Sequence, residues 1–335
     1  MKRKIKNILS VTAVLIAFCL IVSFITILLQ PKYMTDLVEG SMTSQYYKEA
    51  GGHDVIFIGD CEVYANFIPM EMYRQAGITA YVRGNSQQLI WQSFYLLKET
   101  FRYETPKAVV FNVNAMRYDE PVSEAYNRLM MDKMRWSEEK VEIIQASMTE
   151  EEDFLSYVFP ILRYHSRFSQ LTVEDFDYLF REKQNTWQGH LINEGVKPVG
   201  KLPAKRPLKN YAFGDICWEY LDRIRLLCEE KGTELILVKA PSVYPYWYDE
   251  YQQQIDDYAE KYGLSFYNLL DVADTIGIDY ETDTYDGGLH LNFAGAKKLS
   301  LYFANLLAEK HQLADHRGEN SKFDTLLKKY DEATK

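Results

Sequence analysis

Short apolar runs alternate with amphipathic segments through most of the chain. The runs, rich in Val, Ile, Phe and Leu, lie at positions 54–58, 80–82, 108–113, 234–238 and 264–268. Their length and composition are typical of buried strands. Helical patterns lie between them, at 87–101, 216–230 and 248–262. This alternation predicts a three-layer α/β/α domain with a central parallel sheet of about five strands, in which ligands bind at the carboxyl ends of the strands.

The alternation stops between about residues 119 and 206. Helical patterns at 123–131 and 137–146 are followed there by polar, irregular sequence. We therefore expect a helical insertion at about 119–206 in a domain that spans 53–313. The remaining segment, 314–335, is rich in Lys, Asp and Glu. Such a composition predicts a polar tail that is either a solvated helix or disordered.

The N-terminal segment has the pattern of a membrane anchor. An uncharged run from Ile8 to Leu29 follows the basic residues Lys2, Arg3, Lys4 and Lys6. It is long enough to cross a bilayer, and its positive flank places the N-terminus in the cytoplasm. The run continues into Gln30 and Pro31 without a small-residue cleavage site, which favours an uncleaved anchor over a signal peptide. Residues 1–32 are thus expected to be a cytoplasmic stub and single transmembrane helix, followed by a juxtamembrane linker at 33–52 and an extracytoplasmic domain.

Composition and charge exclude several classes of function. The 335 residues, 47% of them hydrophobic, can bury a full core, and the net charge of -10 comes with no basic cluster outside the N-terminus. Nucleic acid is therefore not an expected partner. The four cysteines, at 19, 61, 217 and 228, are too few for a disulfide framework in a chain of this length. Metal-ligand spacings and Gly-rich phosphate loops are missing from the sequence, so no metal or cofactor is expected.

Two segments carry residues suited to nucleophilic catalysis. Cys61 follows Gly59-Asp60 at the end of the first predicted strand, where a nucleophile is exposed beside free backbone N–H groups. His290 lies four residues after Asp286, on a loop that opens a long helix. A carboxylate shortly before a histidine can orient the imidazole as a general base. Each residue also has a plain alternative, Cys61 as a small buried apolar residue and His290 as an ordinary helix N-terminal residue.

These segments, with two others between them, resemble the SGNH (GDSL-type) hydrolase superfamily over roughly residues 53–310. The first block of that family is Gly-Asp-Ser, and here Gly59-Asp60 is followed by Cys61 in place of the serine. The last block is Asp-x-x-His, which His290 matches, although Gly287 occupies the usual place of the aspartate and Asp286 lies one residue earlier. The resemblance is greatest to the membrane-anchored members found in Gram-positive bacteria.

The two middle blocks supply the oxyanion hole in that family. Gly84, in Arg83-Gly84-Asn85, matches the glycine whose N–H contributes to it, and either Asn112 or Asn114 matches the asparagine, without the usual Gly-x-Asn-Asp form. The resemblance implies that His290 takes a proton from Cys61 and that the sulfur attacks an ester carbonyl. Gly84 and Asn112 or Asn114 would then stabilise the oxyanion.

Three functions remain open from the sequence. With water as the acceptor the protein is an esterase or deacetylase of a cell-envelope glycan. With a sugar hydroxyl as the acceptor it is an O-acyltransferase for a surface polysaccharide, which could receive its acyl group from a membrane-bound donor protein. The missing serine and displaced aspartate also fit a binding or assembly module that has lost catalysis. The expected partners are an acylated cell-surface glycan or another small ester, and the membrane.

Overall fold

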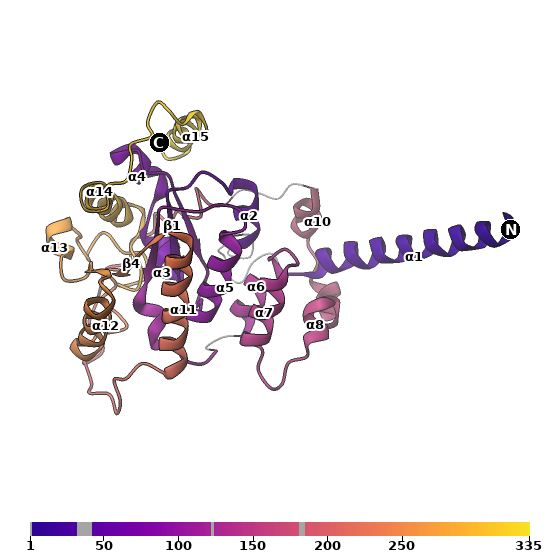
Figure 1. The fold of residues 1–335 in the computed structure, drawn as a ribbon, viewed down its shortest axis with the longest axis horizontal. Coiled ribbons are helices and arrows are strands. Elements are labelled where there is room, and N and C mark those ends of the chain that lie inside the picture. The colour runs from indigo at the N-terminus through magenta and orange to yellow at the C-terminus, as the bar shows by residue number, and fades with distance from the viewer. Residues whose placement is uncertain (1, 32–41, 122–123, 181–184) are drawn as a thin grey trace.

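A parallel sheet lies at the centre of the computed structural model, which describes residues 2–31, 42–121, 124–180 and 185–335 (Figure 1). Its five strands within these ranges are β1 (Val55–Gly59), β2 (Ala80–Gly84), β3 (Ala108–Asn112), β4 (Glu234–Lys239) and β5 (Ser265–Asn268). They are all parallel, in the order β2-β1-β3-β4-β5. This is the flavodoxin-like order, in which a crevice opens at the carboxyl ends beside the first strand. The predicted fold class is confirmed.

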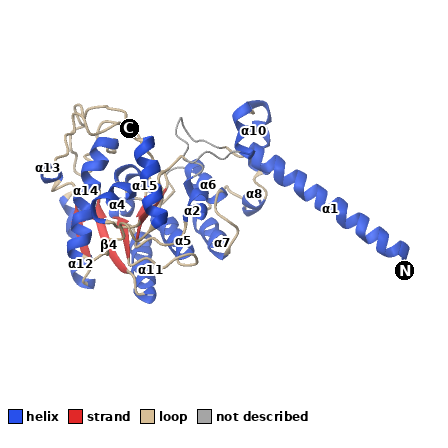
Figure 2. Ribbon diagram, turned by 90° about the horizontal axis from the view of Figure 1, so that it is seen from above, coloured by secondary structure: helices blue, strands red, loops and turns tan. Residues whose placement is uncertain are grey.

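Helices cover both faces of the sheet (Figure 2). In β1, Ile56 and Ile58 point to one face, while Val55 and Phe57 point to the other. The first face packs against α2 (Met42–Glu49), α5 (Ile90–Thr100), α11 (Asp215–Lys231) and α12 (Asp249–Tyr262). The second packs against α3 (Cys61–Asn66), α4 (Pro69–Ala76) and α14 (Phe293–Lys310), with the short α13 (Ala273–Ile276) beside α14. Burial on both faces explains why the strands read as continuous apolar runs.

The chain leaves the sheet between β3 and α11. A 3₁₀ helix, η2 (Val113–Arg117), leads to the helices of the insertion, which are α6 (Glu124–Asp132), α7 (Glu138–Ser147), α8 (Phe154–Val158), α9 (Ile161–Tyr164), the 3₁₀ helix η3 (His165–Gln170) and α10 (Val173–Phe180). Two helices were expected here, at 123–131 and 137–146, and α6 and α7 lie at these places, although Ser123 is outside the described residues. The region after 146, expected to be irregular, contains α8 to α10. α9 and α10 contact the N-terminal helix, and α8 contacts α7 and α9. These neighbours are packing partners that the local sequence of each short helix does not reveal.

The end of the insertion returns to the sheet at its β2 edge. The N–H of Val82, in this edge strand, donates to the carbonyl of Gln188 at 2.9 Å. Gly189 adopts a φ of +84°, and a Cβ on it would lie 2.0 Å from the Val82 carbonyl oxygen. Only glycine fits there. The segment around Gln188 therefore covers the edge of the sheet.

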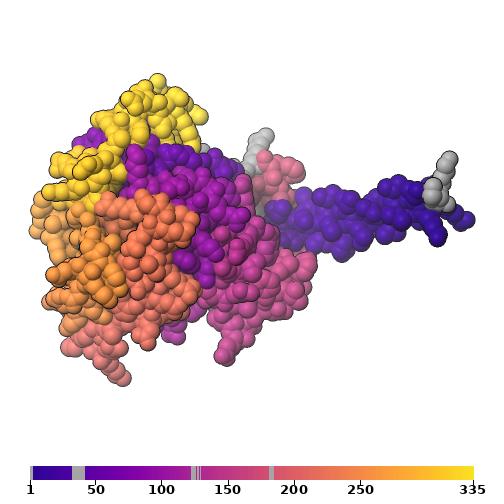
Figure 3. Space-filling model, viewed as in Figure 1, coloured from indigo at the N-terminus to yellow at the C-terminus, as the bar shows by residue number. Residues whose placement is uncertain are grey.

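The N-terminal helix α1 (Lys2–Leu29) stands clear of the domain along most of its length (Figure 3). Its segment Arg3–Leu29 is long and apolar enough to cross a membrane. The C-terminal end of α1 contacts α9, η3 and α10, and Leu28 and Leu29 are buried there. Arg167 of η3 donates to the carbonyl of Leu29 at 2.6 Å. The helix thus has the dimensions of the expected anchor, and its base is fixed to the insertion.

The last segment of the chain differs from the expected polar tail. It contains α15 (Ser321–Ala333), which packs on α4 with Phe323 and Tyr330 fully buried. The Tyr330 hydroxyl donates to Glu71 at 3.2 Å, and Arg74 forms an ion pair with Asp331. Four apolar positions at helical spacing, 323, 326, 327 and 330, form the packed stripe. The charged residues between them obscured this stripe in the composition.

Candidate active site

Cys61 lies where the first strand meets its helix. Strand β1 ends at Gly59, and the Asp60 side chain caps α3 by accepting a hydrogen bond from the Glu62 N–H at 3.1 Å. This cap makes Cys61 the first residue of α3, at the carboxyl end of the sheet. The end of β2 approaches this turn closely, because a Cβ on Gly84 would lie 2.3 Å from Val63 and 2.8 Å from the Asp60 carbonyl oxygen.

The His290 loop brings Asp286 onto the imidazole despite the unusual spacing. Asp286 Oδ2 lies 2.5 Å from His290 Nδ1, and Oδ1 accepts a hydrogen bond from the His290 N–H at 2.8 Å. The two residues that lengthen the loop, Gly287 and Gly288, have φ values of +83° and +99°. Such values favour glycine, so the Gly-Gly pair supplies the bulge that a four-residue spacing needs. The Tyr285 ring stacks on the imidazole with 5.6 Å between centroids.

The loop is also held directly to the helix that carries Cys61. The N–H of Leu291 donates to Asn66, the last residue of α3, at 2.8 Å. Asn292 then caps α14 by accepting a hydrogen bond from the Gly295 N–H at 3.1 Å. The imidazole is therefore fixed from both sides, by Leu291 toward α3 and by Asn292 toward α14.

A cavity of about 260 Å³ lies between Cys61 and His290. The other residues that line it are Asp60, Glu62, Gln87, Asn114, Tyr118, Tyr244, Pro245 and Leu289. The volume is slightly below the usual range of small-molecule sites, so the cavity suits a small group rather than a long chain. It opens at the carboxyl end of β1, where a sheet of this order is expected to bind its ligand.

The thiol and the imidazole perturb each other. Burial raises the pKa of the Cys61 thiol, and the charges of Asp60 and Glu62 raise it further. The charge of His290 and hydrogen bonding to it lower this pKa, but less than burial raises it. Burial lowers the pKa of His290, but the charge of Cys61 and the hydrogen bond to Asp286 raise it well above its ordinary value. The charge of each group therefore favours the charged form of the other, whereas burial favours the neutral forms of both.

Of the three predicted oxyanion residues, the structure places only Asn114 at the cavity. Asn112 is fully buried beneath it, where its amide donates to Asp60 at 3.1 Å and to Glu62 at 2.8 Å and its oxygen accepts from the Ala240 N–H. Gly84 packs behind the Cys61 turn and does not line the cavity. The 3₁₀ helix after β3 directs Asn114 toward Cys61, with its amide 2.8 Å from Asp60. An amide has two N–H groups, and this bond uses one.

A buried polar network under the cavity escaped the sequence analysis. The fully buried Lys239, at the end of β4, lies 3.5 Å from both carboxylate oxygens of Glu62 and donates to Ser242 at 2.7 Å. Ser242 in turn donates to Glu62. Burial lowers the pKa of Lys239, and burial together with the Glu62 charge raises the pKa of Asp60 to about 6. The one signal in the sequence was a lysine closing an otherwise apolar strand.

Comparisons with known proteins give a likeness only to solved structures. No family model matches the sequence, and no curated protein matches it. A GDSL-like lipase from Bacteroides thetaiotaomicron is 12% identical, with 81% of this chain and 99% of that chain covered and a TM-score of 0.38. A candidate acylhydrolase from Bacteroides fragilis is 11% identical, with 80% and 94% covered and a TM-score of 0.39. The order of this chain's own sheet, with Cys61 after the first strand and His290 before α14, agrees with the SGNH (GDSL-type) fold that the sequence resemblance implied.

Proposed function

We propose that this chain is a membrane-anchored acyl-ester hydrolase of the SGNH type, with Cys61 as its nucleophile. The observation that supports this most strongly is that a thiol and an imidazole line one cavity, with the carboxylate of Asp286 bonded to that imidazole. Asp286 lies 2.5 Å from His290, and the charge of His290 lowers the pKa of the Cys61 thiol against the effect of burial. A binding module without catalysis does not need a thiol, an imidazole and a carboxylate arranged in this sequence.

The proposed reaction begins with proton transfer within the pair. Nδ1 of His290 bonds to Asp286, so Nε2 is left to accept the proton of the thiol as the sulfur attacks the ester carbonyl. The second N–H of the Asn114 amide stabilises the oxyanion. His290 then returns the proton to the departing alcohol, which leaves a thioester on Cys61. Water, activated by the same imidazole, releases the acid and regenerates the thiol.

We further propose that the ester belongs to a glycan of the cell envelope. The positive flank of α1 favours an extracytoplasmic position for the domain, and cell-envelope polymers lie on that side. Tyr118 and Tyr244 line the cavity beside the thiol, and flat amphipathic rings of this kind suit sugar rings. A cavity of about 260 Å³ fits a small acyl group such as acetyl.

The same thioester can pass its acyl group to a sugar hydroxyl, which is the second candidate function. The two tyrosines favour it, because a sugar ring held over Cys61 would both supply the acceptor and displace water from the thioester. The donor would then be an acylated carrier, such as a membrane-bound protein. The distinction between the two functions lies in the acceptor and not in the catalytic residues.

The test uses the full chain in lipid nanodiscs with p-nitrophenyl acetate, followed by acid quenching and mass spectrometry. We expect an acetyl group on Cys61, and a rate that falls about 10²- to 10⁴-fold in His290→Ala because the base is lost. Cys228→Ala, a buried cysteine of α11, is the matched control and should act like the wild type. Acetyl transfer that persists in Cys61→Ala would refute the nucleophile. An O-acetylated oligosaccharide with a second sugar then separates the functions, by free acetate or by acetylated acceptor.

A further inference from the structure

We propose that helices α8 to α10 of the insertion form a second membrane contact beside α1, and that acyl chains of bilayer lipid fill the groove between them. The proposal rests on α1 crossing the bilayer, and it does not depend on the proposed enzymatic activity. It assigns a function to a region that the catalytic site leaves unused.

The insertion exposes large apolar side chains that a water-facing surface rarely carries. The exposed fractions of Phe168, Val173 and Phe180 are 74%, 77% and 81%, and Phe159, Leu162 and Phe176 are also exposed. All six lie within 22 consecutive residues, on α9, α10 and the turns beside them. Soluble domains seldom expose apolar side chains in such a group, and a group of this kind marks a contact with protein or membrane.

The position of these side chains beside α1 favours contact with the membrane over contact with another protein. Helices α8 and α10 flank the C-terminal end of α1 in both ribbon views (Figures 1 and 2). α1 contacts α9, η3 and α10, and Arg167 ties η3 to the last residue of α1. When α1 spans a bilayer, its C-terminal end lies at the membrane surface. The exposed side chains then meet the bilayer first, before any protein in solution can reach them.

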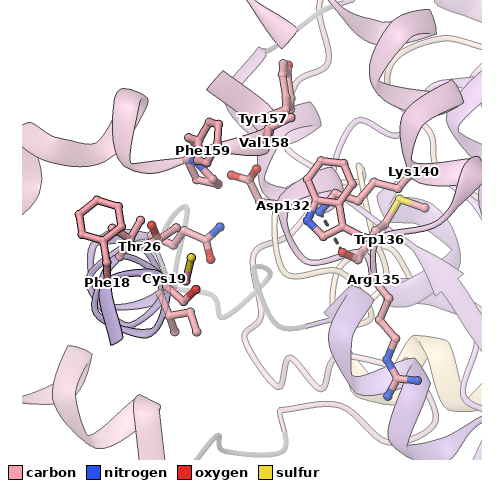
Figure 4. A pocket seen from close by; sticks show the side chains of 16 residues that line it. Phe18, Cys19, Thr26, Asp132, Arg135, Trp136, Lys140, Tyr157, Val158 and Phe159 are labelled. Atoms are coloured by element: carbon pink, nitrogen blue, oxygen red, sulfur yellow. Dashed lines mark hydrogen bonds between the residues drawn. The ribbon is translucent and has the colours of Figure 1, made fainter. Parts of the chain in front are cut away.

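A groove of about 450 Å³ runs between α1 and the insertion (Figure 4). On one side it is lined by Phe18, Val22 and Ile27 of α1, and on the other by Trp136, Tyr157 and Phe159. From Phe18 to the end of α1 the helix rises about 17 Å, which is roughly the thickness of one leaflet of hydrocarbon. The groove therefore follows the half of the membrane span nearest the domain, where its occupant is an acyl chain.

The charged groups of the groove, Asp132, Arg135 and Lys140, are engaged within the protein. Asp132 forms an ion pair with Arg163 at 2.5 Å, and the buried Lys140 lies over the Trp136 ring at 4.5 Å and donates to the Met134 carbonyl. Arg135 lies over the Tyr47 ring at 4.4 Å. These cations are already engaged, so the groove recognises the apolar chain of a lipid and not a particular headgroup. Trp136 and Tyr157 have the amphipathic rings that are enriched at membrane surfaces.

The test measures whether the insertion reaches the hydrocarbon. Leu162→Trp in α9 and Leu226→Trp in α11 form a matched pair, because the two leucines are 55% and 53% exposed and α11 lies on the far side of α7 from α1 (Figure 1). The full-length variants are placed in nanodiscs made from phosphatidylcholine with or without bromine on the acyl chains. We expect bromine to quench about half or more of the emission that Leu162→Trp adds to the wild type, because the indole lies at the hydrocarbon boundary. The emission added by Leu226→Trp should not change.

Two further variants keep the result interpretable. Phe24→Trp, on α1, reports whether α1 itself is in the bilayer, and Phe180→Trp repeats the measurement in case Leu162→Trp does not fold. Quenching of Phe24→Trp without quenching of Leu162→Trp and Phe180→Trp would overturn the proposal. So would unquenched emission accompanied by crosslinked dimers, because a second copy would then cover the apolar side chains.

Discussion

Replacing Lys239 by methionine should destabilise the domain far more than the loss of an ordinary lysine. The side chain is fully buried and lies 3.5 Å from both oxygens of the buried Glu62 carboxylate. Without it, Glu62 is left as a buried charge that keeps only the hydrogen bonds from Asn112 and Ser242. Removing one partner of a buried pair costs about 3–5 kcal/mol, and because these two bonds remain we expect about 3 kcal/mol.

The assay is urea unfolding of the full chain in detergent, followed by tryptophan fluorescence. Lys231→Met is the matched control, because Lys231 pairs with Glu230 at 2.8 Å at the surface, where such a pair contributes less than about 1 kcal/mol. In Glu62→Gln/Lys239→Met the uncompensated charge is gone, and most of the lost stability should return. A cost below about 1 kcal/mol for Lys239→Met, or a double variant no more stable than the single one, would refute the role given to this pair.

Three further predictions concern the pH response and the catalytic groups. Burial lowers the pKa of His190 to about 4 from its ordinary 6.5, so its contribution to stability is present above pH 6.5 and is lost as the pH falls toward 4. Between pH 7 and pH 5 the wild type should therefore lose about 2 kcal/mol of unfolding free energy more than His190→Gln, and equal losses in urea titrations would contradict this. Asp286→Asn should lower the rate of ester hydrolysis about 10²- to 10⁴-fold at nearly constant KM, because the amide cannot stabilise the imidazolium. Initial rates within about tenfold of the wild type would show that Asp286 has no part in catalysis. Because the charge of His290 lowers the pKa of Cys61, His290→Ala should shift the alkylation of Cys61 by iodoacetamide, followed by peptide mass spectrometry, to higher pH, and an unchanged profile would show that the two groups do not interact.

The sheet could be predicted because strands β1 to β4 are buried on both faces, and only β5 at the edge is half-buried. Each continuous apolar run ends at a turn residue, and the five strands begin and end within two residues of the predicted runs. Cys61 and His290 could be placed because both follow from position on such a sheet, one after the first strand and one before α14. The four-residue spacing between Asp286 and His290 does not by itself predict their contact, which depends on the positive φ values of Gly287 and Gly288.

The other features of the site and of the insertion depend on three-dimensional contacts that the sequence alone does not show. Asn112 and Asn114 are two residues apart, and only the 3₁₀ turn after β3 decides which of them reaches the cavity. The pairing of Lys239 with Glu62 joins two strand ends on either side of β3. Helices α8 to α10 are too short to be stable alone, so they depend on packing, α9 and α10 against α1 and α8 against α7.

The segment around Gln188 covers the edge strand β2, so the C-terminal part of the insertion protects the sheet in a way that its helices do not. An uncovered edge strand is a template on which another chain can add a strand, and this is a common start of aggregation. Helices α9 and α10 contact α1 and bury no apolar residue in the core, so they can change without uncovering the sheet. The Gln188–Gly189 turn cannot, because the Gln188 carbonyl accepts the hydrogen bond of the outward-facing Val82 N–H. A shortened version of this protein, made for expression without its anchor, should therefore keep the return segment even where it discards α9 and α10.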